Sequence, residues 1–149
     1  MKNVFTSTES LLLINKVKDE YIRLISLAAE KYDISFRDVD ILSFFAVHTC
    51  FDSPIDCVHY KGYSKTYVSK SLDVLLSKGL IEMKRGSDGD QRFVHVALTK
   101  RSAPLVQEIL DVRSNLDEKA LSGFSDEEID RLLEYMARIS ENINSQDSK

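Results

Sequence analysis

Apolar residues recur at three- and four-residue steps through most of this sequence, and one segment departs from that pattern. Steps of this size place side chains on one face of an α-helix. Between Ile81 and Leu98 the spacing changes to alternation around a Gly-Ser-Asp-Gly segment, which predicts two antiparallel strands joined by a loop. Five Gly and two Pro among 149 residues also favour long helices. The sequence therefore predicts a mostly α (α+β) fold with a single β-hairpin.

Residues that favour helix ends mark the boundaries of the predicted helices. The predicted helix starts are Ser35 or Asp33, Ser53 followed by Pro54 in the first helical position, Ser64, and Ser125 with Glu128. Gly62 and Gly79 are expected to end the two central helices. Four apolar residues are predicted to form the buried stripe of the helix between these glycines: Val68, Leu72, Leu75 and Leu76.

The chain length fits one domain, and no internal repeat or linker divides it. No stretch approaches eighteen apolar residues, so we expect no membrane span. The N-terminal segment lacks the small-residue cleavage site of a signal peptide, and two Cys fit a reducing compartment. We therefore expect a single domain, residues 1–149, in the cytoplasm.

Basic residues concentrate in the middle of an otherwise acidic chain. Residues 61–101 hold nine Lys or Arg against four Asp or Glu, whereas the rest of the chain holds eleven against twenty. A local basic patch suits an anionic partner, although a chance cluster of solvated lysines would give the same count. The charge pattern alone does not decide between the two.

A short helix, a tight turn, a second helix and a hairpin form a winged helix-turn-helix, here at about residues 36–100. With Val68, Leu72 and Leu75 facing inward, four residues of the second helix face outward and are predicted to contact the DNA major groove: Lys65, Thr66, Ser69 and Lys70. Small hydroxyls allow close approach to base edges, and ammonium groups suit phosphates. Gln91 and Arg92 are the predicted DNA contacts of the hairpin, or wing.

The chain resembles the MarR family of bacterial transcription regulators in two segments, GYSKTYVSKSLDVLLSKGLIEMKR at residues 62–85 and DQRFVHVALT at residues 90–99. The family typically has a Ser-x-x-x-Val-Ser-Arg-like recognition helix, then Leu-x-x-Lys-Gly-Leu-Ile, an Asp-Arg-Arg wing and a closing Leu-Thr. The order of the helices matches too, so the resemblance covers nearly the whole chain.

This resemblance implies a homodimer in which the terminal helices, about residues 8–31 and 102–144, form the dimerisation region. Two winged domains would bind double-stranded DNA at a pseudo-palindromic operator. It further implies a repressor that a small-molecule effector, often an aromatic one, releases from DNA. Other members of the family respond to thiol oxidation or to metal.

Three positions depart from the family pattern. Gln91 stands where an arginine usually enters the minor groove, Lys61 replaces a usual apolar residue, and Ser102 replaces a usual glycine. Asp90 and Arg92 match the pair that flanks the family's wing arginine and are expected to bridge. An uncharged Gln91 predicts a wing that contributes little to affinity.

Two cysteine–histidine pairs leave a metal- or redox-responsive regulator as an alternative. His48 and Cys50 end one predicted helix, and Cys57 and His59 lie on the next, but zinc-binding pairs use wider spacing. Cys57 also falls on a position that faces the core. Redox sensing through Cys50 would require a lowered thiol pKa. We predict no metal and no cofactor.

Four aromatic residues either line an effector pocket or pack in the core: Tyr21, Phe44, Phe45 and Tyr60. The sequence shows no nucleophile–base set and no phosphate-binding glycine loop, so we predict no enzymatic activity. A second alternative is a winged-helix protein-interaction module without DNA binding, which a wing tip without cations would suit.

Overall fold

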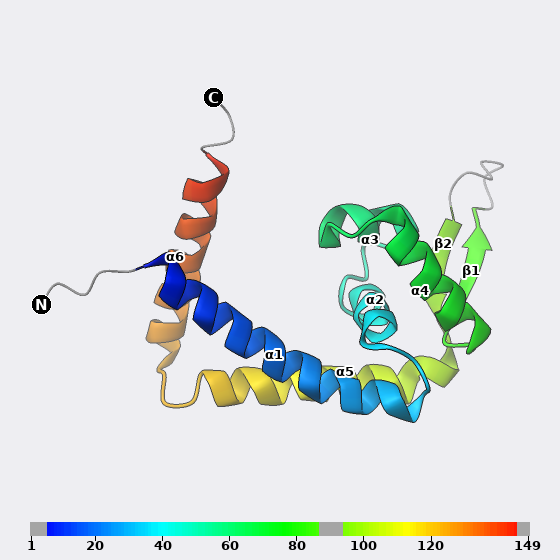
Figure 1. Ribbon diagram of the computed structural model, residues 1–149, viewed down its shortest axis with the longest axis horizontal. Coiled ribbons are helices and arrows are strands. Elements are labelled where there is room, and N and C mark those ends of the chain that lie inside the picture. The colour runs from blue at the N-terminus through cyan, green and yellow to red at the C-terminus, as the bar shows by residue number, and fades with distance from the viewer. Residues whose placement is uncertain (1–5, 87–93, 146–149) are drawn as a thin grey trace, which may run out of the picture. The chain divides into compact units, whose positions relative to one another are not determined.

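The computed structural model of this protein describes residues 6–86 and 94–145. These residues form six α-helices and one two-stranded antiparallel sheet (Figure 1). The elements are, in chain order, α1 (Ser7–Lys31), α2 (Phe36–Val47), α3 (Pro54–Lys61), α4 (Lys65–Ser77), β1 (Ile81–Arg85), β2 (Val94–Leu98), a 3-10 turn (Lys100–Ser102), α5 (Ala103–Ala120) and α6 (Asp126–Asn144). The predicted fold class, mostly α with one hairpin, is confirmed.

The chain forms two compact units, residues 1–113 and 114–149, and the boundary between them falls within α5. The first unit contains α1 to α4, the hairpin and residues 103–113 of α5. The second contains the end of α5 and all of α6. None of the described helices combines the length and the apolar character that crossing a membrane requires.

Side-chain caps begin the helices close to where the sequence predicted them. The Ser35 hydroxyl accepts from the Asp38 backbone N–H, and the Asp38 carboxylate accepts from the Ser35 backbone N–H. Asp33, the other candidate cap, adopts φ 51° in the preceding turn. The same reciprocal pattern begins α3 and α6, at Ser53 with Asp56 and at Ser125 with Glu128.

Glycines end the two central helices, as predicted. Gly62 and Gly79 both adopt φ 68°, a left-handed conformation that glycine reaches without steric cost. Ser64 then caps α4, because its hydroxyl accepts from the Tyr67 backbone N–H at 3.1 Å. Two residues, Tyr63 and Ser64, are therefore enough to join α3 and α4 beyond Gly62.

The core of the first unit is built around α2, in which all residues from 38 to 45 are buried. α1, α3, α4, α5 and the hairpin supply the other members of this core, among them Ile25, Ala28, Cys57, Val68, Leu72, Leu75, Leu80, Ile81, Val96, Leu105 and Ile109. Burying apolar side chains from six elements against one central helix fixes the position of α4 relative to α2.

Leu76 is an exception to the predicted stripe on α4. Val68, Leu72 and Leu75 are at most 2% exposed, whereas Leu76 is 44% exposed. Successive residues on an α-helix are turned by about 100° from one another. Leu76 is therefore carried out of the face that Leu75 buries, and the prediction that Leu76 is buried was wrong.

The hairpin is tied to the helix-turn-helix at its base. The Val96 N–H donates to the Asp52 carbonyl at 2.6 Å, in the segment that precedes α3. The Thr99 hydroxyl donates to the Gly79 carbonyl at 2.7 Å, just after α4. Asp52 precedes α3 and Gly79 follows α4, so the two hydrogen bonds join both ends of the α3–α4 pair to β2 and Thr99. The base of the wing therefore has a fixed position beside α4.

Candidate nucleic-acid interface

Helix α4 buries an apolar face and exposes a polar one. All four predicted major-groove residues are exposed: Lys65, Thr66, Ser69 and Lys70. They lie in the first two turns, so two ammonium groups and two hydroxyls gather near the N-terminus of the helix. This end of a helix carries a partial positive charge, which adds to the attraction for phosphate.

The turn that leads into α4 is held by one buried carboxylate of α2. Asp40 has a side chain only 7% exposed, and it accepts from the Lys61 ammonium at 2.9 Å. Its second oxygen accepts from the Tyr63 hydroxyl. Lys61 and Tyr63 flank Gly62, so Asp40 binds the chain on both sides of the turn. The unusual lysine at position 61 is therefore the counter-ion of a buried acid.

Tyr63 continues this contact to the first turn of α4. Its ring centroid lies 4.4 Å from that of Tyr67, and the guanidinium carbon of Arg37 lies 4.2 Å from the centre of the Tyr67 ring. Burial and the hydrogen bond to Asp40 raise the pKa of Tyr63, so its hydroxyl remains a donor. Polar and aromatic contacts from α2 thus fix the direction in which α4 leaves the turn.

The described part of the wing carries an exposed cation and a histidine contact. Arg85 is exposed at the end of β1. His95 Nδ1 on β2 lies 2.9 Å from an Asp52 carboxylate oxygen, beside the start of α3. The wing residues on which the sequence predictions rest lie outside the described residues: Asp90, Gln91 and Arg92.

The two cysteines differ sharply in their surroundings. Cys57 is fully buried, and this burial raises the pKa of its thiol to about 11, so the thiol is protonated at neutral pH. Cys50 is exposed. Across residues 6–86 and 94–145, no three His, Cys, Asp or Glu side chains are grouped so that they could hold a metal ion. Core packing therefore accounts for Cys57.

A pocket of about 310 Å³ opens between α1, α2, α3 and α5. Tyr21, Phe44 and Tyr60 line it, whereas Phe45 is buried in the core. The His48 ring also lines it, and its centroid lies 4.4 Å from that of Tyr60. Three of the four aromatic candidates therefore surround one cavity.

Charged groups complete the lining of this aromatic pocket. Arg113 of α5 donates to the Ser43 hydroxyl at 2.9 Å, and its guanidinium carbon lies 5.9 Å from the Tyr21 ring centre. Asp40 and Lys61 line the pocket as well. A molecule bound in this pocket would therefore touch the ion pair that holds the turn before α4.

Sequence reasoning missed Asp40 and Arg113. Asp40 lies among the apolar positions of α2, and an acid in such a run needs a buried partner. That rule could have identified Asp40 as a structural or functional residue. No pattern in the sequence connects Arg113 with Ser43, which is 70 positions away.

The helices α3 and α4, supported by α2 and followed by the hairpin, define a winged helix-turn-helix protein of the DNA-binding regulator class. The family model described as transcriptional regulator SarA/Rot matches residues 23–109, more than half of the chain, and the protein belongs to this family. It is a DNA-binding transcriptional regulator, as the sequence predicted, and its fold is of the MarR type.

Solved structures support the same fold. A MarR transcriptional regulator from Methanosarcina mazei Go1 superimposes with TM-score 0.76 at 17% identity, covering 97% of this chain and 95% of that one. The MepR–DNA complex of S. aureus gives 0.74 at 19% identity, covering 95% and 99%. A mutant MarR from E. coli complexed with operator DNA gives 0.64 at 20% identity, covering 85% and 90%.

Proposed function

We propose that this protein is a homodimeric repressor that acts in the cytoplasm and binds a pseudo-palindromic operator, with one α4 in the major groove of each half-site. The observation that supports this most strongly is the exposed cluster at the start of α4: Lys65, Thr66, Ser69 and Lys70. The turn before α4 is rigidly held, so the cluster is presented in one orientation, as recognition of base edges requires.

Lys65 and Lys70 would contact phosphates, because a lysine ammonium is a compact positive charge on a flexible stem and can reach a phosphate oxygen. Thr66 and Ser69 would approach base edges, because a hydroxyl can donate to or accept from any base. Gln91 and Arg92 are proposed wing contacts, of which Gln91 would contribute little because it carries no charge.

Apolar residues at both ends of the chain support the homodimer. Leu11, Leu12, Leu13 and Ile14 on α1 are all at least 58% exposed. On α6, the exposed apolar residues include Leu133, Met136 and Ile143. Pairing these faces with a second copy would remove them from water. We therefore propose that residues 1–149 act as one MarR-type domain, with residues 8–31 and 102–144 as the dimerisation region.

The aromatic pocket is the proposed effector site. Its rings suit a planar ligand, and Arg113 and Lys61 suit a carboxylate. An aromatic acid that attracts Lys61 away from Asp40 would free the turn before α4. Benzoate is a simple probe: it should weaken operator binding by the parent and affect Arg113→Ala less. Equal inhibition of both proteins would argue against this site.

DNA binding through α4 can be tested by charge reversal. Lys70→Glu should abolish operator binding without loss of folding, because the side chain is exposed. Lys65→Ala should weaken binding and lower the slope of log affinity against log salt by about one unit. Lys100→Glu makes the same charge change at the base of the wing and serves as the control. If Lys70→Glu binds like the parent, α4 does not lie in the groove.

A further inference from the structure

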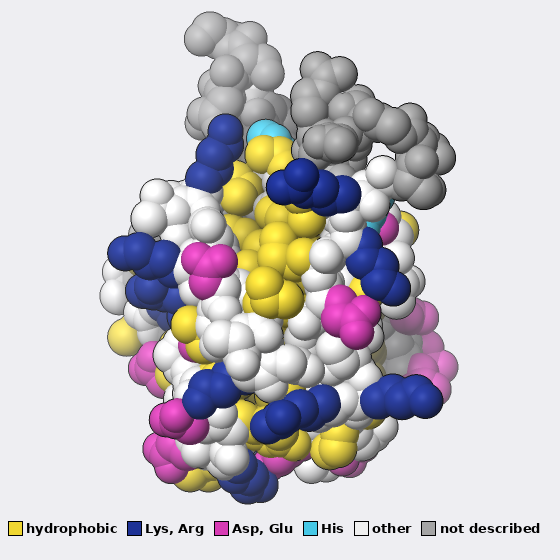
Figure 2. Space-filling view, turned by 90° about the vertical axis from the view of Figure 1, so that its right-hand side faces the viewer, with side chains coloured by type: hydrophobic (Ala, Val, Ile, Leu, Met, Phe, Trp, Pro, Cys, Tyr) yellow, Lys and Arg dark blue, Asp and Glu magenta, His cyan; other side chains and the backbone are white. Residues whose placement is uncertain are grey.

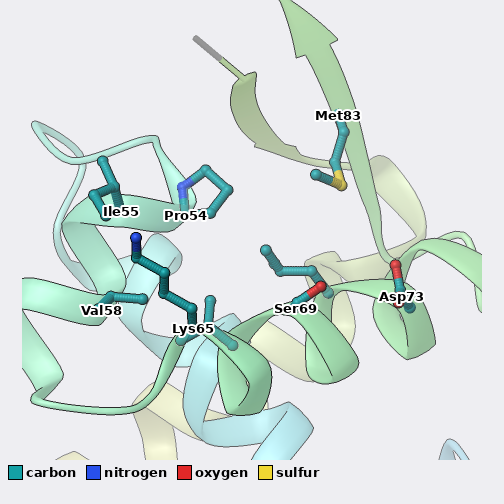
Figure 3. A pocket seen from close by; sticks show the side chains of 9 residues that line it. Pro54, Ile55, Val58, Lys65, Ser69, Asp73 and Met83 are labelled. Atoms are coloured by element: carbon teal, nitrogen blue, oxygen red, sulfur yellow. The ribbon is translucent and has the colours of Figure 1, made fainter. Parts of the chain in front are cut away.

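An apolar groove lies beside the polar face of α4, where α3, α4 and β1 meet (Figure 3). Ile55 on α3 is 40% exposed and Met83 on β1 is 37% exposed, while Val58 and Leu72 line the groove at lower exposure. On this face of the molecule, hydrophobic side chains form a band, and both basic and acidic side chains lie beside it (Figure 2). Exposed apolar side chains that gather in a groove mark a contact surface.

One wall of this groove belongs to the helix that we place in the DNA. Lys65, Ser69 and Asp73 follow one another at four-residue steps on α4, so they share one side of the helix, and all three line the groove. Met83 faces them from β1 (Figure 3). The groove is therefore continuous with the proposed DNA interface rather than a separate surface.

The arrangement of charges also fits a DNA strand. Strand alternation puts Arg85 on the same side of β1 as Met83, so an exposed cation follows the groove on β1. Lys65 supplies a cation on the opposite wall, about two helical turns from Asp73, the acid on that wall. A winged helix with α4 in the major groove and its hairpin at the adjacent minor groove spans the backbone that separates the two. The phosphates of that backbone would meet these two cations.

We propose that this groove recognises thymine through its C5-methyl group, on the strand that passes between α4 and the wing. Thymine alone places a methyl group at the base edge in the major groove. Ile55, Val58 and Met83 offer no hydrogen bond, so a polar group packed between these three side chains would lose its hydration, whereas a methyl group gains from the contact. These three side chains thereby become specificity-determining residues. The inference rests on the proposed placement of α4.

The test uses a duplex that the full-length protein selects from random-sequence DNA. Each thymine is replaced in turn by deoxyuridine, which removes the methyl group and keeps every hydrogen-bonding atom. Affinity should fall about fourfold at the thymines that face the groove, the effect expected for one buried methyl group. A parent protein that is indifferent to deoxyuridine at every position would overturn the inference.

Met83→Gln is the matched protein variant, because glutamine keeps the length of methionine and places an amide in the groove. It should no longer distinguish thymine from deoxyuridine at the sensitive positions. Leu76→Gln changes a comparably exposed residue of α4 that does not line the groove, and it should retain the parent's preference. If Met83→Gln keeps the full preference, the methyl group is recognised elsewhere and the inference fails.

Lys70→Glu on the unmodified duplex separates this inference from the proposed function. If that variant loses binding while deoxyuridine has no effect, the groove does not recognise thymine and the proposed function stands. If Lys70→Glu binds normally, α4 is not in the major groove and both proposals fail.

Discussion

At the scale of single residues, Asp40 connects the core with α4, the helix proposed to contact DNA. Its two oxygens bind Lys61 and Tyr63, which flank the turn before α4. Removing one partner of a buried ion pair leaves the other charge uncompensated, which costs more than the pair itself contributes. The direction of α4 thus depends on a charge that is buried on α2.

Asp40→Asn should therefore lower the free energy of unfolding by about 2–3 kcal/mol, because it removes the charge opposite Lys61. Operator affinity should fall as well, since the turn is no longer held on both sides. Chemical denaturation and binding assays measure the two effects. Asp33→Asn is the control, because Asp33 pairs with Lys78 at the surface with a side chain 95% exposed. Equal behaviour of the two variants would contradict the role given to Asp40.

The thiols provide a second prediction at this scale. In the folded protein at pH 8, a thiol reagent should label Cys50 readily and Cys57 only after unfolding, since Cys57 is buried and protonated. Burial raises the pKa of Cys57 in the folded protein above that of the unfolded thiol. The stability that depends on the protonated thiol is therefore fully present below the pKa of the unfolded thiol and is lost as the pH rises toward 11. Mass spectrometry of the labelled protein identifies which cysteine has reacted. Rapid labelling of Cys57 in the folded protein would contradict this prediction and would favour the redox-responsive alternative.

At the scale of elements, the two faces of α4 have separate tasks. The buried face carries Ser71, whose hydroxyl is the one buried side-chain oxygen or nitrogen without a hydrogen-bond partner among the described residues. The exposed face carries Ser69, two residues earlier. Replacement by alanine should therefore change stability at Ser71 and operator binding at Ser69.

Ser71→Ala should raise the free energy of unfolding by about 1 kcal/mol, because it removes an unsatisfied hydroxyl and introduces a better helix former. It should leave operator binding unchanged. Ser69→Ala should leave stability nearly unchanged and weaken operator binding. Thermal unfolding measures the stability of both variants, and binding titrations measure their operator affinity. A loss of stability in Ser71→Ala would show that the Ser71 hydroxyl has a hydrogen-bond partner.

At the scale of the whole molecule, α6 has an apolar face that no described residue of its own unit covers. No residue of α6 is buried, and Met136 and Ile143 are more than half exposed. An isolated amphipathic helix gains little stability from its own sequence. This supports the proposal that a second copy of the chain completes the fold.

Met136→Glu should therefore convert the dimer into monomers or aggregates, because it places a charge within the proposed interface. Arg138→Glu introduces the same acid on the opposite side of α6 and should leave the dimer intact. Analytical ultracentrifugation at micromolar concentration distinguishes these outcomes. A parent protein that sediments as a monomer would contradict the dimer outright.

The sequence by itself determined the elements and the exposed face of α4. Helix starts depend on contacts between residues three positions apart, such as Ser35 with Asp38 or Ser53 with Asp56, and such contacts form wherever the local sequence allows. The periodicity that buries Val68 and Leu72 also turns Lys65 and Lys70 outward. These features could be predicted because their causes lie within one turn of helix.

Only the tertiary structure decided how the elements cooperate. Lys61 and Asp40 are 21 positions apart, and Arg113 and Ser43 are 70 apart, so no local pattern could pair them. The exposure of Leu76 and the groove between Met83 and α4 likewise depend on which face each element turns toward its neighbour. Such pairings follow from packing the whole core at once, because each buried contact is fixed by the positions of several elements.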